Sequence, residues 1–364
     1  MSYPSVRRKH PIFDVDSHQP RGNDPTARPT VSDVARRAGV SRVTVSKALN
    51  DTGQLSPETR QRVQAAAAEL GFEPNPQARS LTSGRTFTVG LLTSDSIGRF
   101  SIPMLQGIED ALGADSIRVL LCDARGDTER ERKYVRTLLT QRVDGIIVTA
   151  KKTEVRPGIG SLPVPVVYAY AQSDQPQDRA VLPDDVEAGR LAVGHLVAGG
   201  RRRVAYITGP SGALAVRHRE DGARAALEQA GLGLPAAAVR YGEWSEEWGR
   251  EAAAALTAAG VGAGRIDAVF CGSDQIGRGV ADGLRDLGVK VPDDVALVGV
   301  DNWLPMAASC RPPLTTVDLR LEEIGRVAAT ELLARIAGGT AAGARLLPGR
   351  LIVRESSRPG PAGA

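Results

Sequence analysis

The sequence is poor in cysteine and in aromatic residues, and each scarcity narrows what the protein can be. The three cysteines, Cys122, Cys271 and Cys310, are scattered and odd in number, which argues against a disulfide framework or a CxxC metal site. Aromatic residues make up only 4% of the chain, so alanine, valine and leucine have to build the core. We expect the cysteines to be small buried side chains and expect neither a metal nor another cofactor.

Long hydrophobic runs are also missing. No stretch approaches the roughly 18 apolar residues that a membrane span needs, and residues 1–28 are polar and basic, without the apolar segment of a secretory signal. We therefore expect a cytoplasmic protein without membrane contact. Residues 1–28 are predicted to be a disordered basic extension because they show almost no periodicity.

The sequence lacks the short motifs that identify common enzymes. It contains no G-x-S-x-G elbow, no P-loop, no H-E-x-x-H and no cluster of metal ligands. The four histidines are dispersed, and two of them fall in the expected extension. His195 is expected to be structural because it lies within a predicted helix, whereas His218 stands next to Arg219 in the sequence. We expect a protein that is not an enzyme.

Positive charge is concentrated near the start of the chain. Residues 1–90 hold 13 Lys and Arg against 8 Asp and Glu, although the whole chain carries only +4. The remaining residues are nearly neutral. A positive end on a neutral body suits contact with a phosphate backbone, although this excess alone is weak evidence.

Two short helices joined by a tight turn are predicted over residues 30–50. Ser32 is placed to cap the first helix, Gly39 to end it in the left-handed conformation, and Ser41 to cap the second. The second helix carries Val45, Ala48 and Leu49 on one side, and Arg42, Val43, Thr44, Ser46 and Lys47 on the other. This pattern is typical of a helix-turn-helix that enters a major groove. Taken alone, it also fits two ordinary amphipathic helices with a solvated face.

Two further helices are predicted before the chain changes character. Ser56, Pro57 and Glu58 form a strong helix start, and that helix ends at Gly71. A short helix is then predicted from Asn75, with room for about two turns. Such a helix is marginal in water and needs a surface to fold against, which DNA would supply. The alternative is a solvated linker.

From residue 86 onward, strand-like and helix-like segments alternate. The strand-like segments are 86–92, 118–122, 145–149, 164–169, 204–208, 268–271 and 295–300. The helix-like segments are 103–112, 128–141, 185–197, 220–230, 246–258, 275–287 and 321–337. This alternation predicts an α/β body of two doubly wound parallel-sheet lobes, with a ligand cleft at the carboxyl ends of the strands.

These segments together resemble one family in order and over residues 30–356. Residues 30–50, 55–71 and 74–81 resemble the head and hinge helix of lactose-repressor (LacI-type) transcriptional regulators. In the body the matching motifs are residues 142–148, 219–222, 272–275, 294–302 and 311–317. Several are weak singly, but their ordered combination is specific. The resemblance implies a sequence-specific DNA-binding regulator, most simply a repressor, controlled by a small-molecule effector such as a sugar.

The resemblance assigns DNA contacts in the head and the hinge. Arg42, Val43 and Lys47 occupy the positions where such repressors read base edges. Leu81 matches the hinge leucine that wedges into the minor groove, and because two hinge helices pack together, a homodimer on a pseudo-palindromic operator is implied. The full set assigned to DNA is Ser32, Ser41, Arg42, Val43, Thr44, Ser46, Lys47, Asn50, Asn75, Ala78, Arg79 and Leu81.

For the body, the resemblance implies a fold like that of periplasmic sugar-binding proteins, with two lobes joined by three crossovers. The implied domains are a head over 29–73, a hinge over 74–85 and a body over 86–356, followed by a disordered tail over 357–364. The N-terminal lobe is expected at about 86–182 and 318–341, and the C-terminal lobe at about 183–317 and 342–356.

The resemblance also implies an effector site between the lobes. Arg219 and Asp274 match the family's effector-contacting Arg and Asp, which can clamp vicinal hydroxyls from two directions. Trp244 matches an aromatic position near the effector, with ordinary packing as its alternative. The effector contacts expected are Phe100, Tyr170, Arg219, Trp244, Asp274 and Asp301; Arg99 beside Phe100 is a looser match. For Asp301 and Asn302 the alternative is a turn that ends a strand.

The sequence also departs from the family. Residues 168–170 are Tyr-Ala-Tyr where many sugar-responsive members carry Asp, so the ligand's hydroxyl pattern is expected to differ. No leucine heptad occurs near the C-terminus, which argues against a tetramer. Two other functions stay open from the body alone: a transport protein that binds sugar, which leaves residues 30–84 unexplained, and a carbohydrate-active enzyme, for which no paired catalytic carboxylates are evident.

Overall fold

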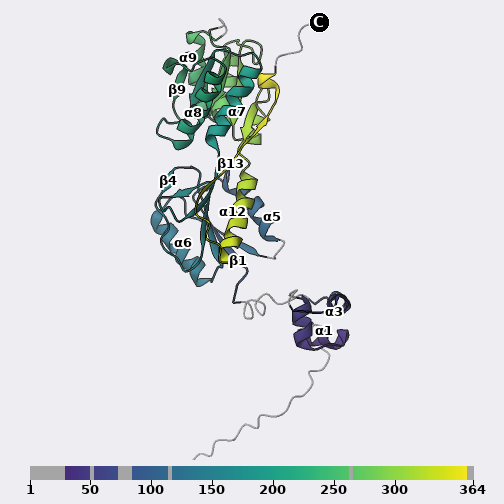
Figure 1. Ribbon diagram of the computed structural model, residues 1–364. Helices are drawn as coiled ribbons and strands as arrows, with labels where there is room; N and C mark the ends of the chain where they lie inside the picture. Colours follow the sequence, from purple (N-terminus) through teal and green to yellow (C-terminus); the bar gives the residue numbers. More distant parts are fainter. Residues whose placement is uncertain (1–28, 50–52, 73–83, 114–116, 262–264, 359–364) are drawn as a thin grey trace, which may run out of the picture. The chain divides into compact units, whose positions relative to one another are not determined.

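The computed structural model describes residues 29–49, 53–72, 84–113, 117–261 and 265–358. Contacts divide the chain into two units, residues 1–84 and residues 85–364, which we call the head and the body. The described part of the head is all helical, and the body alternates strands with helices (Figure 1), which confirms the expected α/β class. No helix in the described ranges is long and apolar enough to cross a membrane.

Some expectations fall outside these described residues. They concern the extension at 1–28, the hinge helix and the end of the tail from residue 359. The individual residues concerned are Asn50, Asn75, Ala78, Arg79 and Leu81. Their roles stay predictions.

Three helices form the head around a small apolar core: α1 (Val31–Ala38), α2 (Arg42–Leu49) and α3 (Pro57–Leu70). Val34, Val45 and Val63 are fully buried where the helices meet, with small alanines around them. Phe72 packs against this cluster just after α3 ends. A core of this size makes only a minimal domain.

Side-chain caps determine where α2 and α3 begin. The Ser41 hydroxyl accepts a hydrogen bond from the Thr44 backbone N–H at 3.1 Å. The Ser56 hydroxyl accepts one from the Thr59 N–H at 3.2 Å. Each bond satisfies a backbone donor that the first turn of a helix leaves without a partner, and both caps had been predicted.

The expected cap of α1 was wrong. Thr30 is the residue before the helix, and its backbone N–H and hydroxyl donate to the Asp33 carboxylate at 2.9 and 2.7 Å. Ser32 lies inside the first turn instead, because this pairing between Thr30 and Asp33 starts the helix earlier. Gly39 ends α1 in the left-handed conformation with φ 64°, as expected.

Two six-stranded sheets form the body, one in each lobe. Their strand orders are β13-β7-β5-β3-β1-β2 in the N-terminal lobe and β14-β12-β11-β10-β8-β9 in the C-terminal lobe. Neighbouring strands are parallel, except that β14 is antiparallel to β12. The strands are β1 (Thr88–Thr93), β2 (Arg118–Asp123), β3 (Gly145–Thr149), β5 (Val166–Ala169), β7 (Arg179–Pro183), β8 (Val204–Thr208), β9 (Val239–Tyr241), β10 (Ala268–Cys271), β11 (Ala296–Val300), β12 (Thr315–Asp318), β13 (Gly343–Leu347) and β14 (Arg350–Ile352), with a separate pair, β4 (Val155–Arg156) and β6 (Gln172–Ser173).

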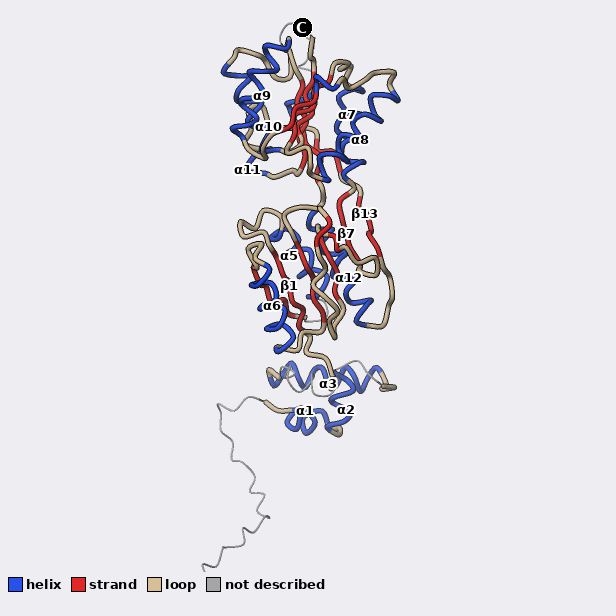
Figure 2. The backbone as a smooth tube through the Cα atoms, turned by 90° about the vertical axis from the view of Figure 1, so that its left-hand side faces the viewer, coloured by secondary structure: helices blue, strands red, loops and turns tan. Residues whose placement is uncertain are grey.

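Helices cover both faces of each sheet (Figure 2). Because side chains alternate along a strand, Val89 and Leu91 of β1 join the cluster that contains α5 and α12, whereas Leu92 joins the cluster of α6. In the C-terminal lobe α7 and α8 pack together, as do α9 and α10. The helices are α5 (Ser101–Gly113), α6 (Thr128–Thr140), α7 (Asp185–Ala198), α8 (Leu214–Gln229), α9 (Glu246–Ala259), α10 (Asp274–Asp286), α11 (Leu304–Ala307) and α12 (Leu321–Ile336), with 3-10 turns η1 (Ala236–Ala238) and η2 (Glu355–Ser357).

The chain passes between the two lobes three times. It crosses from β7 to α7, from β12 to α12, and from β13 to β14. The third crossing comes later than the expected boundary at 341–342, because β13 pairs with β7 in the N-terminal sheet before the chain reaches β14. Only Leu347 of β13 is buried, so the strand lacks the buried apolar run by which most of the predicted strands were recognised.

The expected tail starts too early at residue 357. Ser356 is fully buried and Ser357 is 7% exposed. The Ser357 hydroxyl lies 2.7 Å from Thr315 Oγ1 and 2.7 Å from His195 Nε2, so this segment is fastened to the C-terminal lobe. His195 therefore has the structural role that was expected.

Facing glycines bring three pairs of helices into backbone contact. On α7 and α8, a Cβ at Gly189 would lie 2.0 Å from the Arg219 carbonyl oxygen, and one at Gly222 would lie 1.9 Å from the Val186 carbonyl oxygen. No side chain fits such a gap, so these positions require glycine. The same arrangement joins α5 to α12 through Gly107 and Gly325, and α9 to α10 through Gly249 and Gly279.

The α7–α8 contact can be tested with two substitutions on one helix. Gly189→Ala should lower the free energy of unfolding by about 1–3 kcal/mol because its methyl group would overlap the α8 backbone. Gly194→Ala is the matched control, since a Cβ there meets no atom of the described residues within 4 Å. The control should be stabilising by about 0.5–1 kcal/mol. Chemical denaturation of the full chain measures both, and equal stability of the two variants would contradict the proposed close contact.

Candidate functional sites

The first candidate site is the outer face of α2 in the head. Val45 and Ala48 turn inward and are buried, whereas Arg42, Val43 and Lys47 are exposed. Val43 is 64% exposed, which is unusual for a valine on a helix that has an apolar core beside it. The face therefore presents two cations and one apolar group, a combination suited to phosphates, guanine edges and thymine methyl groups.

Contacts to α1 and α3 hold this face in place. The Arg37 guanidinium pairs with Glu69 at 2.6 Å and so ties α1 to α3. Arg62 Nε donates to the Ala38 carbonyl oxygen at 3.0 Å, where α1 ends and the turn begins. The turn before α2 is thus braced by a neighbouring helix, so the short α2 does not depend on its own helical propensity.

The second candidate site is a cavity of about 270 Å³ in the body. Its lining comes from segments that follow the carboxyl ends of β1, β3, β5, β8, β9, β10 and β11, so both lobes contribute. Parallel strands place their carboxyl ends together, and this edge is where α/β folds bind ligands. The lining residues are Arg99, Phe100, Lys151, Lys152, Thr153, Glu154, Tyr170, Ala213, Ala215, Arg219, Trp244, Ser273 and Asp301.

Arg219 forms the most deeply buried charged part of the lining, at 3% exposure. Its Nε donates to an Asp185 carboxylate oxygen at 2.8 Å and its Nη1 to the Gly272 carbonyl oxygen at 2.6 Å. Burial disfavours the charge of Arg219, but the carboxylates of Asp185 and Asp301 outweigh that effect and raise its pKa. The guanidinium stays charged. Helix α8 starts at residue 214, earlier than the expected 220, so Arg219 sits on the helix itself.

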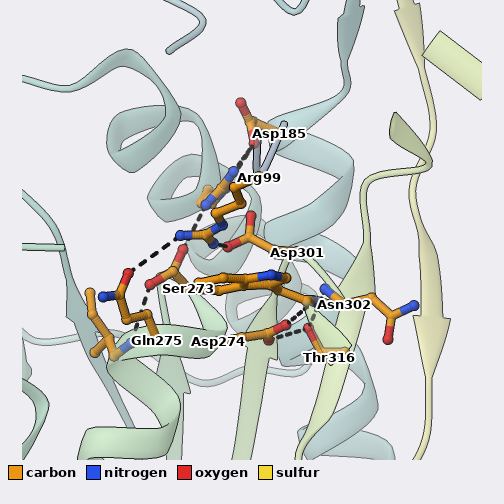
Figure 3. Close-up of polar contacts among 12 residues, drawn as sticks. Arg99, Asp185, Ser273, Asp274, Gln275, Asp301, Asn302 and Thr316 are labelled. Carbon is orange, nitrogen blue, oxygen red and sulfur yellow. Dashed lines mark hydrogen bonds and ion pairs between the residues drawn. The ribbon is translucent and has the colours of Figure 1, made fainter. Parts of the chain in front are cut away.

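Asp274, an expected effector contact, lies behind the cavity and does not line it; its contact with an effector stays a prediction. Its side chain is fully buried, and its carboxylate accepts from the Trp303 backbone N–H at 2.7 Å and from the Thr316 hydroxyl (Figure 3). Burial raises the pKa of Asp274, and the charge of Asp301 raises it further. The neighbouring Ser273, which precedes α10 as its N-cap in an extended conformation, lines the cavity instead.

Aromatic rings form another part of the lining. Phe100 and Tyr170 stack with ring centroids 5.0 Å apart and an interplanar angle of 21°. Burial raises the pKa of Tyr170, so its phenol is neutral and able to donate as well as accept. Trp244 is half-buried and packs closely over Gly209, where a Cβ would lie 2.3 Å from the indole. Aromatic faces of this kind suit the apolar face of a sugar ring.

Besides Arg99 Nε, two polar atoms of the lining have no partner within the described structure. Thr153 Oγ1 and Glu154 Oε2 are buried and make no hydrogen bond within the described structure. Such atoms are costly unless something else satisfies them. The sequence interpretation missed both residues, as it missed Lys151, Lys152 and Ser273. Their position just after β3 or β10 is the signal that could have found them.

The cavity brings together Phe100, Tyr170, Arg219, Trp244 and Asp301, which the resemblance had grouped. Arg99, the looser match, joins them, whereas Asp274 does not. Asn302 lines a neighbouring hollow. A contact of any of these residues with an effector stays a prediction. The fold and the two sites define a class: a regulator with a DNA-binding head and a ligand-binding body.

Comparisons with known proteins give the family. The model for "Bacterial regulatory proteins, lacI family" matches residues 30–75, and that for "Periplasmic binding protein-like domain" matches residues 193–357. The ribose operon repressor of Escherichia coli (strain K12) is 33% identical over 316 residues, which cover 84% of this chain and 93% of that protein. The regulator CelR of Thermobifida fusca is 36% identical over 339 residues, covering 90% and 98%.

Solved structures agree. A CelR–cellobiose complex matches with TM-score 0.61 and 34% identity, covering 90% of this chain and 100% of that one. The lac repressor dimer bound to operator and the anti-inducer ONPF matches with TM-score 0.68 and 27% identity, covering 92% and 100%. The chain belongs to the LacI family of transcriptional regulators.

The buried pair of Arg219 and Asp185 can be tested by removing one partner. Arg219→Met should lower the free energy of unfolding by about 3–5 kcal/mol, because Asp185 would remain buried without a counter-charge. The double variant Arg219→Met/Asp185→Leu should recover most of that loss. Arg190→Met, which breaks the exposed pair of Arg190 with Glu187 at 2.5 Å, is the control and should cost less than about 1 kcal/mol. Denaturation curves that rank the double variant below Arg219→Met would refute this account.

Proposed function

We propose that this protein is a transcriptional repressor that binds a pseudo-palindromic operator as a homodimer and releases or gains that operator when a small sugar binds in the body. The observation that carries the proposal is one chain with two distinct surfaces. An exposed cationic helix face lies on the head, and a buried polar and aromatic cavity lies in the body.

The head supports binding to double-stranded DNA. Helix α2 is anchored on its inner side by Val45 and Ala48, and its outer side offers Arg42, Val43 and Lys47. In this reading α2 lies in the major groove, where Arg42 and Lys47 contact guanine or phosphate and Val43 contacts a thymine methyl group. Ser32, Ser41, Thr44 and Ser46 have hydroxyls within the same two helices and their turn, and they contact the backbone phosphates.

The cavity supports a small polyhydroxylated ligand. At about 270 Å³ it lies at the lower end of ligand pockets, which suits a small sugar better than a long oligosaccharide. Arg219 and Thr153 supply hydrogen bonds, Glu154 accepts them, and the rings of Phe100 and Trp244 cover apolar faces. Two relatives point the same way, since one is a ribose operon repressor and the other was solved with cellobiose.

Coupling between the two sites requires two states of the body. A sugar that contacts both lobes binds a closed arrangement more tightly than an open one, and only such a difference can shift the equilibrium. In a dimer, that shift would change the separation of the two heads and with it the fit to two half-sites.

The DNA-binding role of α2 predicts a loss of operator affinity. Operator sites can be selected from a random DNA pool with the full-length protein and measured by fluorescence anisotropy at several salt concentrations. Arg42→Ala and Lys47→Ala should each weaken binding by about 1–3 kcal/mol, and loss of a phosphate contact should also reduce the salt dependence.

Arg132→Ala is the control for these variants. It removes a cation of equal charge from α6 of the body, where the side chain is 63% exposed, and should leave operator affinity unchanged. Failure of the wild-type protein to enrich any sequence from the pool would refute the proposed function. Equal losses for Arg132→Ala and Lys47→Ala would show that net charge, and not the α2 face, governs binding.

The sugar-binding role predicts a selective effect of Thr153→Val. The full-length protein is mixed with D-ribose, D-glucose or cellobiose, and a sugar that binds only the folded state raises the melting temperature. Thr153→Val should weaken binding on the order of tenfold. It should not lower the melting temperature without sugar, because the lost hydroxyl has no hydrogen-bond partner among the described residues.

Thr137→Val is the matched control, since the Thr137 hydroxyl bonds the Lys133 carbonyl oxygen on α6, away from the cavity. Its sugar response should equal that of the wild-type protein. An unchanged sugar response in Thr153→Val would remove Thr153 from the ligand site.

A further inference from the structure

One ion pair joins the two lobes across the cleft. Arg99 follows β1 in the N-terminal lobe, and Asp301 directly follows β11 in the C-terminal lobe. The Arg99 guanidinium pairs with the Asp301 carboxylate (Figure 3), and their side chains are only 15% and 7% exposed. Within the described residues, no other ion pair links an element of one lobe to an element of the other.

Aromatic rings from both lobes hold the Arg99 guanidinium. It lies 4.4 Å from the centroid of the Trp303 ring in the C-terminal lobe and 4.9 Å from that of Phe100 in its own lobe. Its Nη1 also donates to Gln275 Oε1 at 3.4 Å. Cation–π contact is strongest where water is excluded, and this guanidinium is mostly buried. Its contacts with the opposite lobe are those with Asp301, Trp303 and Gln275.

The ion pair of Arg99 and Asp301 lies between two cavities and lines both of them. Arg99, Phe100 and Asp301 line the 270 Å³ cavity on one side and a larger hollow of about 640 Å³ on the other. A ligand in the smaller cavity therefore faces both charged groups. The Asp301 carboxylate, which could accept from two ligand hydroxyls, already accepts from Arg99.

The surrounding backbone holds Asp301 in this position. Asp301 has φ 114° and Asn302 has φ 53°, conformations that residues with a side chain adopt at a cost. The Asn302 side-chain oxygen accepts from Arg354 Nη2 at 2.7 Å, which fixes the turn from the C-terminal side. The hydrogen-bonding groups of Arg99 are not all satisfied, because its Nε is buried without a hydrogen-bond partner within the described structure. Asp301 is thus the fixed partner and Arg99 the one that can leave.

We propose that Arg99 competes with the effector for Asp301. Its guanidinium pairs with the Asp301 carboxylate and links the two lobes, and a neutral sugar has to displace it from that carboxylate. This inference rests on the proposed sugar-binding function of the cavity. This ion pair would make Arg99 a determinant of effector affinity and selectivity, since a ligand can bind Asp301 only if its own hydrogen-bond donors replace those of Arg99. A ligand that makes no hydrogen bond to Asp301 would not displace Arg99.

The test compares Arg99→Met, Arg99→Lys and a control in the full-length protein. Methionine keeps an unbranched stem between the two rings but cannot pair with Asp301. The control is Arg125→Met, because the pair of Arg125 with Asp123 at 3.8 Å lies within the N-terminal lobe. Hydrogen exchange is followed by mass spectrometry in segments 97–105 and 301–306 without sugar. Affinity is measured for whichever of D-ribose, D-glucose and cellobiose binds the wild-type protein most tightly.

Arg99→Met should speed exchange in both segments and tighten sugar binding on the order of tenfold, the ratio that corresponds to one charge-assisted hydrogen bond lost by the competitor. Arg99→Lys should lie between it and the wild type, and Arg125→Met should match the wild type. Weaker sugar binding by Arg99→Met would overturn the proposal, because Arg99 would then be a ligand contact. Unchanged exchange in either segment would overturn it as well.

The experiment also distinguishes a failure of the proposed sugar-binding function from a failure of the proposed competitor role of Arg99. If none of the three sugars binds the wild-type protein or Arg99→Met, the sugar-binding function falls and the competitor role falls with it. If a sugar binds the wild-type protein and Arg99→Met does not bind it more tightly, the competitor role alone falls.

Discussion

The contact between α7 and α8 is the constraint on which the cavity of the body depends. Asp185 stands at the start of α7 and Arg219 in the second turn of α8, and both are nearly inaccessible to water. A buried charge is tolerated only when its partner lies within hydrogen-bonding distance. Gly189 and Gly222 remove the side chains that would keep the helices apart, so backbone packing and electrostatics require the same helix spacing.

Arg219 also connects α8 to the end of a strand in the C-terminal sheet. Its second donor reaches the Gly272 carbonyl oxygen just after β10, and the next residue, Ser273, lines the cavity. The residue after that, Asp274, turns back toward Trp303 and Thr316. One buried network thus sets which side chain at the start of α10 faces the cavity, and it explains why the neighbouring residues Ser273 and Asp274 lie in different surroundings.

The head and the body differ in how far their charged side chains are exposed to water. In the head, Arg42 and Lys47 remain in water and cost little to keep charged, which suits long-range attraction to DNA. In the body, Arg219 and Arg99 are withdrawn from water and depend on carboxylates and rings around them. The exposed charges suit binding to a polyanion, whereas the buried ones suit selection of a small neutral ligand.

The sequence alone determined the local features of this protein: caps at Ser41 and Ser56, the left-handed turn at Gly39, the alternation of strands and helices, and family motifs in order. These follow from interactions between residues a few positions apart, so a single sequence reveals them. It misplaced the cap of α1 and the third crossing at β13, and it did not reveal that Asp274 is fully buried behind the cavity. Only the tertiary structure decided that Thr153 and Ser273 line the cavity and that Arg99 meets Asp301, because those positions depend on how segments far apart in the chain pack together.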